Sequence, residues 1–144
     1  MSQILLVPVD GSEPALRALT WAIEQSKDRV DARIAVINVQ NLALLDLGDA
    51  AAIMPPGWEM TAMEAASKKV LDEAVAHARR HGSEVIAKGA RGAVGEAIVS
   101  FCQDIGASQI IMGTRGLGGV RGLLTGSVAF HVVHLSHVPV TLVK

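Results

Sequence analysis

One stretch decides the fold of this 144-residue chain: Gly113-Thr-Arg-Gly116, then nine residues, then Gly126-Ser127. The apolar run 109–112 before it predicts a short buried strand, and the apolar residues after Ser127 recur with a helical period. The glycines therefore lie on a crossing from a strand to a helix. Unpaired backbone N–H groups at a helix N-terminus attract anions, and glycine lets the backbone approach a ligand closely. The stretch predicts a phosphate-binding loop.

Two arginines inside this loop, Arg115 and Arg121, can offset phosphate charge. The loop is not a Walker A motif, because the chain has no Gly-Lys-Ser/Thr sequence. It is not the dinucleotide fingerprint either, because Gly116-x-Gly118 is followed by Arg121 where the third glycine would stand. The alternative is a glycine-rich connector that binds nothing.

Strand-like and helix-like segments alternate along the chain. We predict strands over 4–9, 33–39, 84–88, 110–112 and 138–143, a helix beginning near residue 13, and helices over 58–80, 95–105 and 127–136. Apolar strands separated by helices imply an α/β fold with a parallel sheet covered on both faces, in one domain spanning 1–144. The irregular link 40–57 is long for a compact domain, which indicates a functional segment.

Asp10 follows the first predicted strand. There it can cap the next turn together with Ser12, accept hydrogen bonds from a ribose hydroxyl, or hold a metal ion near phosphates through water. A phospho-accepting receiver aspartate is disfavoured, because the third strand runs into Lys88-Gly89 and does not end in an aspartate.

The five histidines of the chain fall into two groups. His131, His134 and His137 recur every third residue, but no carboxylate or cysteine lies nearby in sequence, so we expect partly exposed side chains and no metal site. His77 and His81 lie near the end of a charged helix, where we expect them to be solvated.

Composition limits the classes of function. Half of the residues are apolar and 3% are aromatic, so the core must be aliphatic. The net charge of −1 gives no reason to expect a nucleic-acid or membrane-surface binder. The single cysteine, Cys102, excludes an internal disulfide, and we expect it to be buried and inert. No apolar run reaches the length of a membrane span and no basic signal region is evident, so we expect a cytoplasmic protein.

Three stretches together resemble the nucleotide-binding branch of the universal stress protein family. They are Pro8-Val-Asp-Gly-Ser12, the loop 113–127 with its G-x2-G-x9-G-[ST] spacing, and Val138-Pro-Val-Thr-Leu-Val143. The resemblance covers essentially the whole chain. It implies an adenine nucleotide alpha hydrolase-like fold with strand order 3-2-1-4-5, and a crevice between the strands that end at Val9 and Met112.

The resemblance also implies a binding site for ATP, alone or with Mg2+. The glycines, Ser127 and Arg115 would hold the triphosphate, the backbone of Val39 would read the adenine edge, and Asp10 would face the ribose and, through water, the metal ion. The implied nucleotide contacts are Pro8, Val9, Asp10, Val39, Met112, Gly113, Arg115, Gly116, Gly126, Ser127 and Val128.

The function implied is that of a nucleotide-dependent regulatory module in a stress response, with at most slow hydrolysis or autophosphorylation. The sequence offers no general base near the loop beyond Asp10 and no catalytic lysine. The alternatives are a slow ATPase or phosphotransferase, and a nucleotide-free dimeric interaction protein. In the order 3-2-1-4-5 the segment 138–143 is an apolar edge strand, which predicts a homodimer through that strand. The resemblance implies the same interface.

Overall fold

A five-stranded parallel sheet forms the centre of the computed structural model, which describes residues 2–41, 48–114 and 126–144. Its strands run in the order β3-β2-β1-β4-β5, as predicted, and every pairing is parallel. Their bounds are β1 (Gln3–Pro8), β2 (Ala32–Gln40), β3 (Val85–Arg91), β4 (Gln109–Gly113) and β5 (Val140–Val143).

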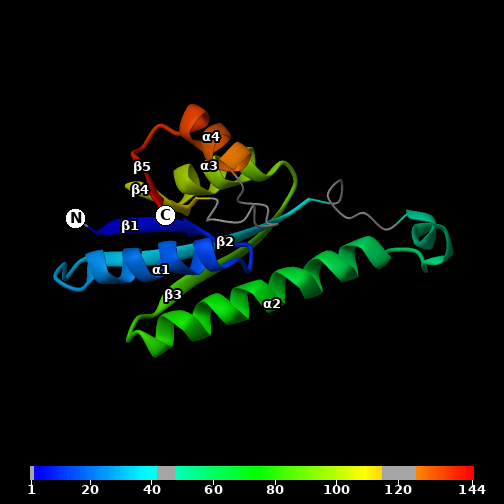
Figure 1. Cartoon of the computed structure of the whole chain (residues 1–144), viewed down its shortest axis with the longest axis horizontal. Coiled ribbons are helices and arrows are strands. Elements are labelled where there is room, and N and C mark those ends of the chain that lie inside the picture. The colour runs from blue at the N-terminus through cyan, green and yellow to red at the C-terminus, as the bar shows by residue number, and fades with distance from the viewer. Residues whose placement is uncertain (1, 42–47, 115–125) are drawn as a thin grey trace.

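Helices cover both faces of the sheet (Figure 1). One face packs against α1 (Glu13–Ser26) and α2 (Trp58–Arg80), and the other packs against α3 (Val94–Asp104) and α4 (Gly126–Leu135). A short 3-10 helix, η2 (Gly48–Ile53), lies within the segment predicted to be an irregular link. Among the described helices, none combines the length and the apolar character that crossing a membrane requires.

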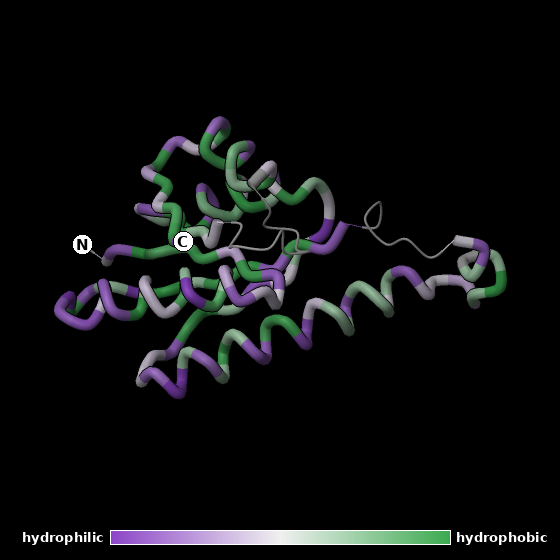
Figure 2. The backbone as a smooth tube through the Cα atoms, in the orientation of Figure 1, coloured by the Kyte–Doolittle hydropathy of each residue, from purple (hydrophilic) through white to green (hydrophobic). Residues whose placement is uncertain are grey.

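The core lies on both sides of the three central strands. Leu6, Val36 and Ile110 are fully buried there, and Figure 2 shows a mostly hydrophobic β1, whereas hydrophilic and hydrophobic residues alternate along α1 and α2. Strands buried on both faces read as continuous apolar runs, which is why the sequence pattern located them.

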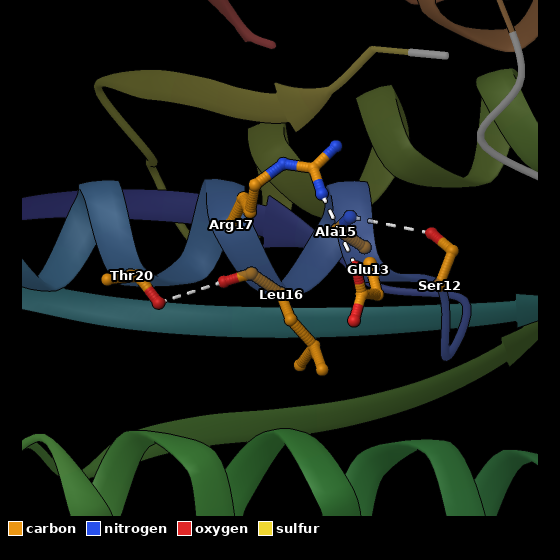
Figure 3. Close-up of polar contacts among 6 residues, drawn as sticks. All are labelled: Ser12, Glu13, Ala15, Leu16, Arg17 and Thr20. Carbon is orange, nitrogen blue, oxygen red and sulfur yellow. Dashed lines mark hydrogen bonds and ion pairs between the residues drawn. The ribbon is translucent and has the colours of Figure 1, made fainter. Parts of the chain in front are cut away.

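Local capping sets the start of α1. The Ser12 Oγ accepts a hydrogen bond from the Ala15 N–H at 3.4 Å, and Pro14 lies in the first helical turn, where a missing donor costs nothing (Figure 3). Arg17 pairs with Glu13 across one turn on the exposed side of the helix. The sequence signals for this helix start are confirmed.

Two strands differ from their predicted bounds by more than one residue at one end, and the other three differ by one residue at each end. β3 continues to Arg91, because Gly89 stays in register with Asn38 of β2 and does not break the strand. β5 begins at Val140, two residues later than predicted. The Ser136 Oγ accepts a hydrogen bond from the Val138 N–H at 3.1 Å, which makes a turn there.

Candidate functional site

The strand order reverses between β1 and β4, and the chain leaves these two strands toward opposite faces. β1 leads to α1 on one face, and β4 leads toward α4 on the other. Such a switch point leaves a crevice beyond the carboxyl ends of the strands, where open α/β sheets bind their ligands. Asp10 follows β1 and Gly113 ends β4, so two of the predicted site residues flank this place.

Asp10 is held in a defined orientation. Its Oδ1 accepts a hydrogen bond from the Ser12 N–H at 2.9 Å, which makes an Asx turn. Gly11, between the two, has a φ of +85°, a conformation that a residue with a side chain rarely adopts. The predicted capping role of Asp10 is confirmed, and it fixes where the half-buried carboxylate lies.

The end of β2 directs backbone groups toward the same place. In a parallel strand, alternate residues point both their N–H and their C=O toward the same neighbour. The carbonyl of Ile37 accepts a hydrogen bond from the Val9 N–H at 2.8 Å, on the β1 side. Val39 lies two residues further on and therefore also points its N–H and C=O to that side, but β1 has already ended at Pro8. Val39 is 4% exposed as a whole residue and its side chain belongs to the hydrophobic core, so the group left for a ligand at this strand end is its backbone.

A buried amide that sequence reasoning missed ties these strand ends together. Asn38 is 1% exposed, and its Nδ2 donates a hydrogen bond to the Val9 carbonyl at 2.8 Å. The Gln40 Nε2 donates in turn to the Asn38 Oδ1 at 2.7 Å. The available signal was a lone amide inside the apolar run 33–39. Because buried polar groups need partners, this network fixes Val9 relative to β2.

Close packing requires a glycine at position 113, which the sequence did not reveal. A Cβ at this position would lie 2.3 Å from the carbonyl oxygen of Pro14 and 2.8 Å from the Ala15 nitrogen. Both atoms are backbone in the first turn of α1, so they cannot swing aside. The absence of a side chain is therefore required for α1 to pack on β4, whether or not a phosphate binds nearby.

The other predicted residues are placed as follows. Pro8, Val9, Asp10 and Val39 line one small hollow of about 10 Å³, with Val94 and Ile98 of α3 as its opposite wall. That is room for about one water molecule. Met112 is fully buried. α4 begins at Gly126, one residue before the predicted start, with Ser127 exposed and Val128 half-buried in its first turn. Arg115 and Gly116 lie outside the described residues.

Side chains suited to metal binding or acid–base chemistry are sparse. In the described ranges, no group of three or more His, Cys, Asp or Glu residues could hold a metal ion. His131, His134 and His137 are exposed, as expected. Cys102 is buried, and burial raises the pKa of its thiol.

The prediction that His77 is solvated is wrong. Its Nε2 lies 2.7 Å from the Thr20 Oγ1 on α1, and its side chain is half-buried between the two helices. Burial is the main cause that lowers its pKa, and the nearby His81 and Arg80 lower it further. The sequence showed only a polar helix end, whereas the packing of α1 on α2 decides the environment.

A family model described as the universal stress protein family matches residues 1–144. The chain belongs to this family. A universal stress protein of Methanocaldococcus jannaschii is 29% identical over 143 residues, which cover 97% of this chain and 81% of the relative.

Solved structures of the family are also similar to this universal stress protein. A family member from Burkholderia pseudomallei is 26% identical with a TM-score of 0.69, covering 98% of this chain and 95% of the other. A universal stress protein from Archaeoglobus fulgidus in complex with dAMP is 24% identical with a TM-score of 0.65, covering 100% and 98%. Two further similar structures are of family members with cAMP and, from Arabidopsis thaliana, with AMP. The fold is therefore the adenine nucleotide alpha hydrolase-like fold.

Proposed function

We propose that this universal stress protein binds ATP, alone or with Mg2+, at the switch point between β1 and β4. The observation that carries the proposal is the backbone of Val39, whose N–H and C=O point past the end of β1 toward the side of Asp10. An adenine edge presents both an acceptor and a donor, and one extended residue can match them. Similar family members bind dAMP, AMP and cAMP, which supports an adenine nucleotide.

In this proposal each predicted residue has one role. Pro8, Val9 and Met112 line the base and sugar pocket, and Asp10 accepts from the ribose or holds Mg2+ through water. The glycines 113, 116 and 126, together with Arg115, Ser127 and the Val128 N–H, surround the phosphates. The start of α4 at Gly126 supports this last role, because a helix N-terminus is a favourable place for anions.

We further propose that the nucleotide regulates and is not rapidly turned over. Near the switch point, the carboxylate among the described residues is that of Asp10, and it already accepts the Ser12 N–H. With one oxygen already held by the backbone, it is a poor candidate for the general base that rapid hydrolysis would need. A slow ATPase or phosphotransferase is the competing function, and a cytoplasmic location stays a prediction.

We also propose a homodimer through β5, which is an edge strand. Apolar side chains lie exposed on this strand and on the adjacent α4: Leu142 is 42% exposed, Val133 46% and Phe130 74%. An apolar edge with unpaired backbone groups favours pairing with a second copy. A nucleotide-free dimeric interaction protein would share this surface, so that hypothesis and the nucleotide-binding hypothesis differ only in whether a nucleotide binds.

Calorimetric titration of the purified protein with ATP, with and without Mg2+, tests the nucleotide proposal. Mass spectrometry of the denatured protein should also release a co-purified adenine nucleotide. GTP is the matched control ligand, because it carries the same triphosphate but reverses the donor and acceptor at the base edge. Equal affinity for ATP and GTP would contradict the role of Val39, and no heat with either would refute nucleotide binding.

A further inference from the structure

A second hollow lies between α2 and β3, on the sheet face opposite to α3 and α4. Its volume is about 490 Å³, within the range of small-molecule sites. Residues 63–72 of α2 form one wall, and residues 87–91 of β3 form the other. We call it the α2–β3 hollow. It arises because β3 presents Ala87 and Gly89 to α2, and these residues are too small to fill the space.

Ser67 of α2 lines this hollow and carries an unexplained polar group. The residue is 8% exposed, yet its Oγ has no hydrogen-bond partner among the described residues. A Cβ at Gly89 would lie 3.0 Å from this Oγ, so the hydroxyl lies between helix and strand. An unsatisfied buried hydroxyl is costly, and a mid-helix serine usually bonds the carbonyl four residues back, which this one does not do. A ligand in the hollow that Ser67 lines would offer this hydroxyl an acceptor.

Two opposite charges without ion pairs line the same hollow. Among the described residues, neither Arg91 of β3 nor Glu64 of α2 takes part in an ion pair, whereas Lys68 pairs with Asp72. α2 and β3 run in opposite directions (Figure 1), and Ser67 lies opposite Gly89. Arg91, two residues after Gly89, and Glu64, three residues before Ser67, therefore lie toward the same end of the hollow.

Apolar side chains line another part of the hollow. Met63 is 7% exposed, and Leu71 is half-buried and faces Gly89, where a Cβ would lie 3.7 Å from the Leu71 Cδ1. Ala87 continues this apolar surface on β3. The hollow thus combines an apolar wall, one orphan hydroxyl, one cation and one anion outside any ion pair, and the Lys68–Asp72 ion pair. Since the two charges cancel, it suits a ligand of zero net charge that carries both signs.

We propose that the α2–β3 hollow binds a small α-amino acid with an aliphatic side chain. The Arg91 guanidinium binds the carboxylate with two parallel hydrogen bonds, which its planar geometry favours. The Glu64 carboxylate accepts from the ammonium group, and the Ser67 hydroxyl donates to a carboxylate oxygen. The aliphatic side chain packs against Leu71. This site is separate from the proposed nucleotide site, and its occupation does not depend on ATP.

Titration of the ¹⁵N-labelled protein with L-leucine, followed by amide chemical shifts, tests this proposal. We expect saturable shifts in residues 63–72 and 87–91. Two matched probes lack one charge each: 4-methylpentanoate has no ammonium group, and 3-methylbutylamine has no carboxylate. Each should bind at least about tenfold more weakly, as expected for the loss of a charge-assisted contact.

Single substitutions test which side chains contact the bound leucine. Arg91→Gln and Ser67→Ala should each weaken L-leucine binding about tenfold or more, whereas the exposed controls Arg80→Gln and Ser100→Ala should not change it. Without leucine, Ser67→Ala should raise the melting temperature, because it removes an orphan hydroxyl. A melting temperature lowered by Ser67→Ala would refute the orphan assignment.

Three other outcomes would overturn the proposal. Equal affinity for L-leucine and for either singly charged probe would show that the paired charges do not select the ligand. The absence of saturable shifts with L-leucine would show that the hollow does not bind an α-amino acid. Shifts in the hollow on addition of ATP and not of leucine would assign the hollow to the nucleotide site.

Discussion

Replacing Gly113 with alanine should destabilise the protein strongly, even in the absence of any ligand. The added Cβ would lie 2.3 Å from the Pro14 carbonyl oxygen, where real contacts are longer by about an ångström. Relief requires α1 to move away from β4, since both contacting atoms are backbone. Overpacking of a core costs about 1–3 kcal/mol and occasionally more, and we expect the upper end, about 3 kcal/mol. For a chain of this length that lowers the melting temperature by about 10 °C.

Gly95→Ala in α3 is the matched control. Its added Cβ would also be close to another atom, 2.7 Å from the His131 Nδ1, but that atom belongs to an exposed side chain that can rotate away. Alanine is also the better helix former, by up to about 1 kcal/mol. This variant should therefore stay within about 1 kcal/mol of the parent protein.

Urea unfolding of the parent and both variants measures the free energies. The midpoint should fall for Gly113→Ala with an unchanged slope, because the surface exposed on unfolding stays the same. If Gly113→Ala unfolds within 0.5 kcal/mol of the parent (about the scatter of surface substitutions), the packing argument is wrong and Gly113 is free to serve the ligand alone. If both variants are equally destabilised, the distinction between rigid backbone and mobile side chain fails.

Three further predictions concern the Asp10 carboxylate, the β5 edge and the half-buried His77. Asp10→Asn keeps the acceptor for the Ser12 N–H, so its free energy of unfolding should match that of the parent within about 0.5 kcal/mol, whereas Asp10→Ala should lose about 1 kcal/mol. Both variants should reduce any effect of Mg2+ on ATP binding, measured by calorimetry. Leu142→Lys places a charge on the exposed edge strand and should shift the sedimentation of the protein from dimer mass to chain mass, while a parent protein already at chain mass would refute the β5 dimer. The pKa of His77 is lowered below 6.5 in the folded state, so the unfolded chain binds the proton first and the stability of the protein should fall as the pH drops below 6.5. The melting temperature of His77→Gln should therefore fall less between pH 8 and pH 5 than that of the parent. An identical fall would contradict the desolvation of His77.

Continuous apolar runs and helix caps were enough to predict the parallel sheet and four of its helices. The Ser12 cap, the start of α4 at Gly126 and the strand over 109–113 depend on neighbours in the sequence, so a local pattern reveals them. The strand order came from the resemblance to the universal stress proteins, because periodicity does not say which strands pair. Local patterns likewise predicted Asp10 as a capping residue.

Only the tertiary structure decided the features that depend on residues far apart in the chain. The Asn38 side chain hydrogen-bonds the Val9 carbonyl at the end of the neighbouring strand, and His77 of α2 hydrogen-bonds Thr20 of α1. The Pro14 backbone leaves no space for a side chain at Gly113. The α2–β3 hollow likewise exists only because small residues of β3 face Ser67. Burial and close approach between distant segments set these environments, and no local pattern carries that information.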